Sequence, residues 1–104
     1  MKNLATNEWK EALRNSDSGV IIDVRTNEEF ESGYIKGAIL ADIQDPHSFT
    51  EKVQELDKSK DYYVYCRSGK RSLLACQVME SMGFEKVTNL EGGILSWDEE
   101  TVLP

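Results

Sequence analysis

Two short runs of β-branched and aromatic residues constrain this chain more than any other feature of its sequence. The first spans residues 20–24, directly after Ser18 and Gly19, and the second spans residues 62–65. Both are apolar at successive positions, which is typical of strands buried on both faces of a parallel sheet. Weaker runs at residues 38–41 and 87–90 predict two further strands.

Helical patterns lie between these strands. Thr6 is expected to cap a first helix that buries Trp9 on its apolar face. A second, short helix is expected to open at Asn27 and to close near Gly33, and Ser48 is expected to cap a third. Strands that alternate with helices in this way predict an α/β domain with a mainly parallel sheet.

The clearest helical pattern follows Cys66 and ends before Gly83, which is expected to adopt the left-handed conformation beyond the helix, with Phe84 as the apolar contact after it. The apolar stripe of this helix is expected to consist of Leu74, Ala75, Val78, Met79 and Met82.

Length and charge narrow the functional classes. The chain has 104 residues and a formal net charge of −7, which predicts one domain over residues 1–104 and disfavours binding to nucleic acid or to an anionic membrane. Apolar runs stay far shorter than the roughly 20 residues that a membrane-spanning helix needs, and residues 1–15 show no secretory signal. We therefore expect a cytoplasmic protein whose two cysteines are reduced.

Cys66 stands where a strand is expected to end, and in an open α/β sheet this is the edge at which ligands bind. The next residues turn into a helix N-terminus, whose free N–H groups and dipole favour an anion. Arg67, Lys70 and Arg71 add positive charge, and Gly69 permits a positive φ. The pKa of the Cys66 thiol is therefore expected to lie below its free value of about 8.5, giving a reactive thiolate that attracts an anionic substrate.

Several motifs occur in an informative order. Residues 22–25 read Ile-Asp-Val-Arg, residues 33–39 read Gly-Tyr-Ile-Lys-Gly-Ala-Ile, and residues 66–72 read Cys-Arg-Ser-Gly-Lys-Arg-Ser. Gly-Phe at 83–84 and Leu-Glu-Gly-Gly-Ile-Leu-Ser-Trp at 90–97 follow. Together they resemble the signature motifs of the rhodanese family of sulfurtransferases, and the resemblance covers nearly the whole chain.

This resemblance implies a three-layer α/β fold, with helices on both faces of a five-stranded, mainly parallel sheet. It also implies that the Cys66 thiolate takes the outer sulfur of a donor such as thiosulfate, becomes a persulfide, and passes that sulfur to cyanide or a thiol. No metal or organic cofactor is implied. Arg67, Lys70 and Arg71 would orient the anionic donor, while Ser68, Gly69 and Ser72 would shape the persulfide cradle.

Alternative functions stay open. A persulfide carrier that works only with a protein donor or acceptor would keep all of these motifs. A cysteine-dependent phosphatase of the same fold is disfavoured, because such enzymes hold their anion in a longer loop with five residues between Cys and Arg. Here four residues separate Cys66 from Arg71. A binding module without a working cysteine is disfavoured by the presence of Cys66 and its basic neighbours.

The remaining side chains that could react or bind a metal are expected to have structural roles. Cys76 is expected to be a buried core thiol, and His47, the one histidine, is expected to be a surface or helix-capping residue. Two cysteines ten positions apart and one distant histidine match no zinc ligand spacing. Tyr34 stands where the rhodanese family usually has His, and we expect this change to affect packing more than chemistry.

Four residues are expected to support the site rather than react. Asp23 and Arg25 are expected to fix a loop through hydrogen bonds, with Glu29 as a plausible partner of Arg25. Gly92 and Gly93 are expected to allow close backbone approach beneath the Cys66 loop.

Overall fold

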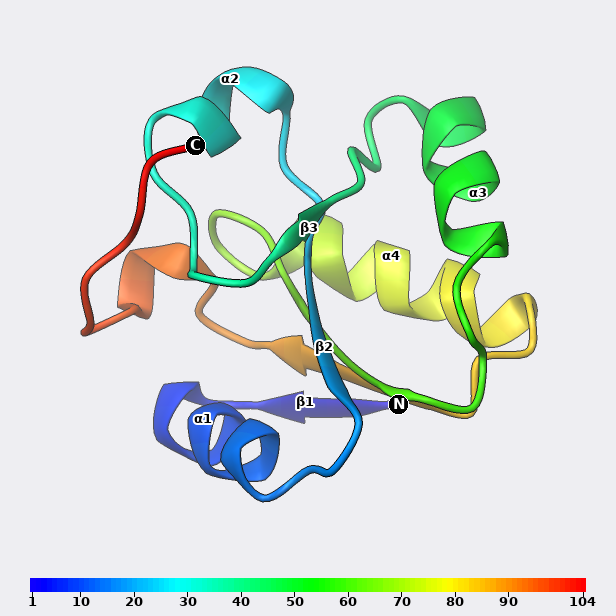
Figure 1. The fold of residues 1–104 in the computed structure, drawn as a ribbon, viewed down its shortest axis with the longest axis horizontal. Helices are drawn as coiled ribbons and strands as arrows, with labels where there is room; N and C mark the ends of the chain where they lie inside the picture. The colour runs from blue at the N-terminus through cyan, green and yellow to red at the C-terminus, as the bar shows by residue number, and fades with distance from the viewer.

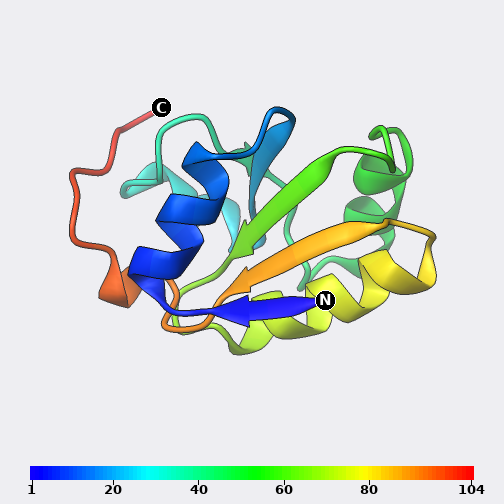
Figure 2. The same cartoon turned by 90° about the horizontal axis from the view of Figure 1, so that it is seen from below.

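The computed structural model describes residues 1–104. Five strands form one sheet in the order β1-β5-β4-β2-β3, and every neighbouring pair is parallel. Figure 2 shows the arrows of β1, β5 and β4 pointing the same way. The strands are β1 (Lys2–Leu4), β2 (Gly19–Asp23), β3 (Ile39–Leu40), β4 (Asp61–Tyr65) and β5 (Lys86–Leu90).

Four α-helices and one 3₁₀ turn surround the sheet, with α1 on one side of the strands and α3 and α4 on the other (Figure 1). The helices are α1 (Thr6–Arg14), α2 (Asn27–Glu31), α3 (Pro46–Gln54), α4 (Lys70–Ser81) and the 3₁₀ turn η1 (Ile94–Ser96). This arrangement confirms the expected α/β fold with a five-stranded parallel sheet. No helix is both long and apolar enough to cross a membrane.

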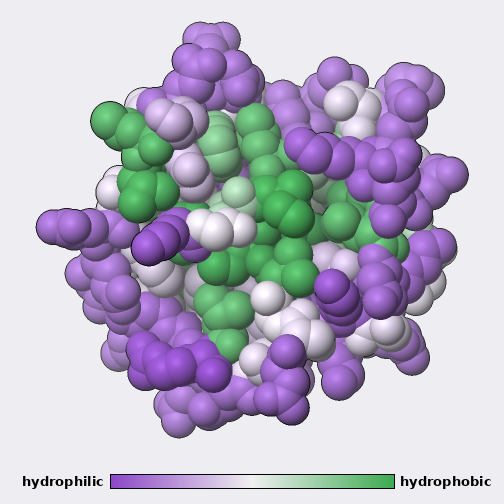
Figure 3. All heavy atoms as spheres, in the orientation of Figure 1, coloured by the Kyte–Doolittle hydropathy of each residue, from purple (hydrophilic) through white to green (hydrophobic).

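Strand β4 lies at the centre of the sheet and divides the core in two. Tyr62 and Val64 join the larger cluster, which α3 and α4 cover, whereas Tyr63 and Tyr65 join a second cluster around Trp9 of α1. Both faces of β4 are therefore buried, as its unbroken apolar run predicts. Strand β3, by contrast, is a two-residue strand at the edge of the sheet, and both of its residues are only half-buried. An apolar region lies around it at the centre of the face seen in Figure 1 (Figure 3).

Two of the expected helix caps are wrong. Ala5, in extended conformation, precedes α1 without a side-chain cap, because the hydroxyl of Thr6 lies 2.7 Å from that of Ser96 instead. Helix α3 is capped by Asp45, whose carboxylate accepts the Ser48 N–H at 3.4 Å. A proline at the first helical position shifts the start of α3 before Ser48.

The end of α4 follows the expected pattern, but its buried face differs from the expected apolar stripe. Gly83 has a φ of +98°, and the Phe84 N–H donates to Met79 O at 3.1 Å, which closes the helix as predicted. Leu74, however, is 54% exposed. Ala75 and Met79 are buried as expected, and Val78 and Met82 pack partly buried against the core. Ser72 and Cys76 are buried on this helix as well.

Candidate active site

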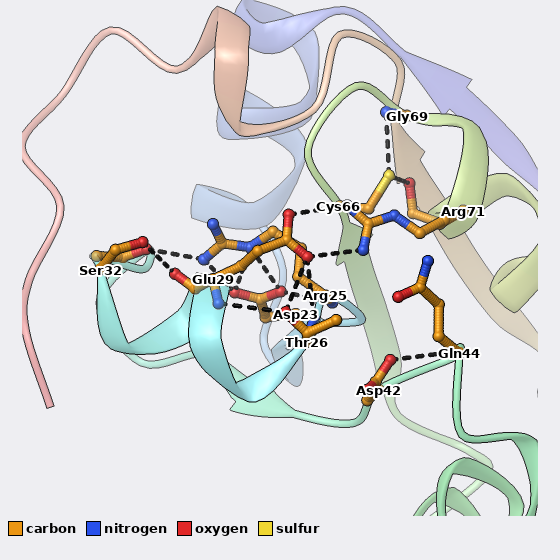
Figure 4. Close-up of polar contacts among 12 residues, drawn as sticks. Asp23, Arg25, Thr26, Glu29, Ser32, Asp42, Gln44, Cys66, Gly69 and Arg71 are labelled. Atoms are coloured by element: carbon orange, nitrogen blue, oxygen red, sulfur yellow. Dashed lines mark hydrogen bonds and ion pairs between the residues drawn. The ribbon is translucent and has the colours of Figure 1, made fainter.

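Cys66 lies immediately after β4, at the carboxyl edge of the sheet, and is 1% exposed. The loop that follows it reaches the helix N-cap at Gly69, whose φ of +97° only glycine adopts readily. Figure 4 shows the Cys66 sulfur turned into this loop, toward Gly69 and the start of α4. The strand and helix therefore place the thiol where the sequence predicts it.

Hydrogen-bond donors surround the sulfur. The Gly69 N–H donates to Cys66 Sγ at 3.1 Å, and the Ser72 hydroxyl lies 3.3 Å from it. Burial raises the pKa of the Cys66 thiol, but hydrogen bonds from the Ser72 hydroxyl and from the N–H groups of Ser72, Gly69 and Ser68 lower it further, so the pKa falls below its ordinary value. The shift has the expected direction, and hydrogen bonds supply the contributions that lower it most.

The three basic residues of the loop have different surroundings. Arg67 and Lys70 are exposed, as expected for groups that meet an anion from solvent. Arg71 is turned toward α2, where its guanidinium donates to Glu29 through two parallel hydrogen bonds of 2.8 and 2.9 Å (Figure 4). The charge of Arg71 is therefore largely balanced inside the protein.

The pairing of Arg25 with Glu29 is wrong. Arg25 instead binds the Asp23 carboxylate, with Nη2 at 2.7 Å from Oδ2, and also donates to Gly33 O at 2.8 Å. Glu29 is the third residue of α2, where it forms a capping box with Thr26. That position directs its carboxylate toward Arg71 of α4, a contact between distant segments that sequence spacing does not reveal.

The Glu29–Arg71 pair is expected to make the stability of the fold depend on pH in the acid range. The hydrogen bonds from Arg71 lower the pKa of Glu29 to about 2. The pair therefore stabilises the fold fully above the unfolded pKa of about 4.3, and this contribution is lost as pH falls toward 2. Glu29→Gln should reduce the free energy of unfolding at pH 7 by about 1 kcal/mol, given solvent screening of a half-buried pair. Urea unfolding at pH 7 and near pH 2 would measure the difference.

Glu28 supplies the matched control for this experiment. It is an exposed neighbour on α2, so Glu28→Gln should leave stability nearly unchanged at both pH values. An equal loss of stability in both variants, or a loss in Glu29→Gln that persists at pH 2, would contradict the assignment.

Asp23 and Arg25 form a buried support beside Cys66. They are 0% and 5% exposed, and Asp23 Oδ2 also accepts the Tyr65 hydroxyl at 2.7 Å. Tyr65 precedes Cys66 and pairs with Asp23 in the sheet register. Both charged residues are buried, and each has hydrogen-bond partners that compensate for the loss of water. The geometry therefore agrees with a structural role for both.

The turn between β5 and η1 lies beneath the Cys66 loop. The Ile94 N–H donates to Cys66 O at 2.9 Å and the Leu95 N–H to Arg67 O at 3.1 Å. A Cβ on Gly93 would lie 2.3 Å from Arg67 O, so close approach depends on this glycine. Gly92 differs from expectation, because a Cβ there would meet the Ser96 side chain at 2.4 Å rather than the loop.

One residue that sequence reasoning missed reaches the loop from the sheet. Asn89, at 1% exposure near the end of β5, donates from Nδ2 to Gly69 O at 3.1 Å. A polar residue within a stretch of sequence predicted to be a strand does not by itself indicate a functional role. Only its position beside the Cys66 loop, which depends on the order of strands in the sheet, makes it informative.

The remaining chemical residues lie away from this site or are packed out of reach. His47 is 88% exposed and pairs with Glu51 on α3. Cys76 is fully buried, and this burial raises the pKa of its thiol to about 12. Tyr34 stacks on Phe30 at a ring separation of 4.0 Å, which agrees with a packing role.

The two cysteines should therefore react very differently. In the folded protein at pH 8, iodoacetamide should modify Cys66 alone, because the Cys76 thiol stays protonated and buried. Mass spectrometry should find one adduct, and two after unfolding in guanidinium. Rapid modification of both cysteines in the folded chain would show that Cys76 is accessible to the reagent and would contradict its burial in the core.

The cavities of the protein lie elsewhere. Two clefts of about 380 and 690 Å³ occur, and neither is lined by a residue of the Cys66 loop. Arg67 and Ser68 at the loop tip are exposed, so the site meets solvent at a shallow surface rather than at the end of a deep pocket. Such a site suits a small anion or a protruding group on a partner.

Comparisons with known proteins agree with this geometry. A family model described as a rhodanese-like domain matches residues 6–100. The Bacillus subtilis protein named "Putative sulfurtransferase YtwF" is 38% identical over 101 residues, which cover 97% of this chain and 94% of that protein. A tRNA uridine(34) hydroxylase of Cytophaga hutchinsonii is 37% identical, but the match covers 95% of this chain and 32% of the hydroxylase.

Solved structures show the same fold. The crystal structure of a rhodanese-like domain protein from Staphylococcus aureus superposes with a TM-score of 0.85 at 33% identity, and the match covers 100% of this chain and 99% of that one. The family match, the full-length relative and this superposition all point to one assignment. The chain belongs to the rhodanese-like family of sulfurtransferases.

Proposed function

We propose that this protein transfers sulfane sulfur through a persulfide on Cys66, with thiosulfate as a suitable donor and cyanide or a thiol as acceptor. The observation that carries the proposal is the set of donors aimed at Cys66 Sγ, at 3.1 Å from Gly69 N and 3.3 Å from Ser72 Oγ. They lower the pKa of the thiol without a neighbouring base, which favours the thiolate form that attacks the donor.

The first step transfers sulfur to the enzyme. The Cys66 thiolate attacks the outer sulfur of thiosulfate, a new S–S bond forms to Cys66, and the bond to the sulfonate sulfur breaks. Sulfite leaves with the electron pair of that bond, and Cys66 carries an anionic persulfide. The N–H groups that hold the thiolate are placed to stabilise this second anion.

The second step regenerates the thiolate. An acceptor nucleophile attacks the terminal persulfide sulfur, and the S–S bond to Cys66 breaks with its electron pair on Cys66. With cyanide the product is thiocyanate, and with a thiolate it is the acceptor persulfide. Neither step changes the protonation of a side chain, so no general base is needed beside Cys66.

The loop residues have distinct proposed roles. Arg67 and Lys70 are exposed and attract the anionic donor, while Ser68, Gly69 and Ser72 supply the cradle. Arg71 contributes in a different way from the one expected for a free cation, because Glu29 binds it. Its place is to fix α2 against the start of α4, with a weaker electrostatic effect on the site.

A protein donor or acceptor is the second candidate, and one observation favours it. Leu74 and Leu95 are 54% and 62% exposed. They belong to α4, which follows the loop, and to η1, where the Leu95 N–H donates to Arg67 O. Exposed leucines beside a shallow reactive site are typical of a surface that contacts another protein. The phosphatase alternative loses support, since the guanidinium that would hold a phosphoryl group is engaged by Glu29.

The direct test is to mix the protein with thiosulfate and examine it before an acceptor is added. We expect a mass increase of one sulfur atom on the peptide that contains Cys66, reversed by cyanide with release of thiocyanate. Cys76→Ala should behave like the wild type. If no persulfide forms, thiosulfate is excluded as the donor, and a persulfidated protein donor is the next substrate to test. Assignment to the cytoplasm and to one domain over residues 1–104 stays a prediction.

A further inference from the structure

We propose that Asn89 is a positioning residue that fixes the N-terminus of α4 and thereby aims the hydrogen-bond donors at Cys66. The inference rests on the proposed function only in that Cys66 acts as a thiolate. Asn89 lies at the point where β5 passes beneath the Cys66 loop, and its side chain is 1% exposed.

The contact joins the sheet to the residue that caps the helix. Asn89 Nδ2 donates to Gly69 O at 3.1 Å, while the N–H of the same Gly69 donates to Cys66 Sγ at 3.1 Å. Gly69 O also accepts the Leu73 N–H of α4 at 3.2 Å, so it already has a partner without Asn89. Asn89 is therefore not needed to give this carbonyl a hydrogen-bond partner, and its contribution is to hold the carbonyl in place.

The amide of Asn89 has a defined orientation because its neighbours fix it. The Glu91 carboxylate can only accept, so Asn3 turns its Nδ2 toward Glu91 Oε2 at 3.1 Å. Asn3 then presents its oxygen to Asn89, whose Nδ2 donates to Asn3 Oδ1 at 2.9 Å. Asn3 and Asn89 are register partners on the parallel strands β1 and β5. Asn3 Oδ1 and Gly69 O are both acceptors, so each of them requires Nδ2 of Asn89 as the donor.

The oxygen of the Asn89 amide indicates that packing alone does not explain an asparagine at this position. Asn89 Oδ1 is buried and has no hydrogen-bond partner among the protein atoms. A buried acceptor without a partner is unfavourable, and an apolar side chain would avoid it. What asparagine adds at this position is the Nδ2 donor, which reaches both Gly69 O and Asn3 Oδ1.

The decisive measurement is the pH dependence of Cys66 alkylation by iodoacetamide, a neutral probe, in the full-length chain. Asn89→Leu removes the donor and leaves an apolar side chain of similar size, while Asn89→Ser keeps a hydroxyl that is too short to reach Gly69 O. We expect both to raise the apparent thiol pKa by about one unit, so that alkylation below the pKa slows about tenfold. Cys66→Ser provides the background rate of Cys76.

Asn3→Ala is the matched control. It removes the other contact of the Asn89 amide but leaves Gly69 O within reach, so its shift should be clearly smaller than that of either Asn89 variant. A role in stability alone would lower the melting temperature of the Asn89 variants without moving the alkylation profile.

The outcomes separate this inference from the proposed function. Folded Asn89 variants with the wild-type alkylation profile would overturn the positioning role, and Asn89→Ser decides the question if Asn89→Leu does not fold. Absence of sulfur transfer in the wild type would instead count against the proposed function, because the alkylation profile does not depend on any sulfur donor.

Discussion

Cys66→Ser should reduce sulfur transfer from thiosulfate by roughly a thousandfold or more, to the uncatalysed background. Serine is nearly the same size as cysteine and fits the buried position, so the fold should survive. Its hydroxyl is not ionised at neutral pH and forms no persulfide, so the covalent intermediate is lost. The measurement is thiocyanate production at saturating thiosulfate and cyanide, with circular dichroism to verify folding.

Cys76→Ala is the control for this experiment. Its thiol is fully buried in the core and has a pKa of about 12, so turnover should change little even if stability falls slightly. Substantial activity in Cys66→Ser, or its loss in folded Cys76→Ala, would move the reactive sulfur to the second cysteine and contradict the proposed mechanism.

The second large effect is expected at Gly93. Its φ of +62° and ψ of −167° lie in a region that essentially only glycine adopts, and a Cβ would stand 2.3 Å from Arg67 O and 2.6 Å from Ser68 N. These are backbone atoms of the Cys66 loop, so they cannot rotate away. Gly93→Ala should lower the free energy of unfolding by about 2–4 kcal/mol and slow Cys66 alkylation, because the loop must move.

Gly37→Ala separates steric overlap from backbone strain. Gly37 has a φ of +91°, but a Cβ there would meet nothing within 4 Å. Its substitution should cost about 1 kcal/mol and leave Cys66 reactivity unchanged. Equal effects of the two substitutions on stability and on alkylation would show that the close contact between Gly93 and the loop is unimportant.

Local chemistry made much of the fold predictable. The apolar runs at residues 20–24 and 62–65 correspond to β2 and β4, and Gly83 ends α4 in the left-handed conformation. Cys66 follows a strand and precedes a helix N-terminus, which a single stretch of sequence specifies. These features depend on neighbours in the chain, and a pattern of residues is enough to predict them.

Contacts between distant segments were not predictable in the same way. Strand β1 has only three residues, Lys-Asn-Leu, and exists because β5 offers it a parallel partner. The pairing of Arg71 with Glu29, and of Asn89 with Gly69, likewise depends on how α2, α4 and β5 meet in space. One sequence records the residue types but not which pairs the fold brings together.

The pairing of β1 with β5 has a consequence for the newly made chain. Asn3 and Asn89 are 86 positions apart, so this contact forms only after the whole stretch between them has been synthesised. Cys66 leaves the ribosome before Asn89 and Gly93 exist to shape its loop. The hydrogen bonds that lower the pKa of Cys66 therefore belong to the folded domain, in which residues 89 and 93 contact the loop.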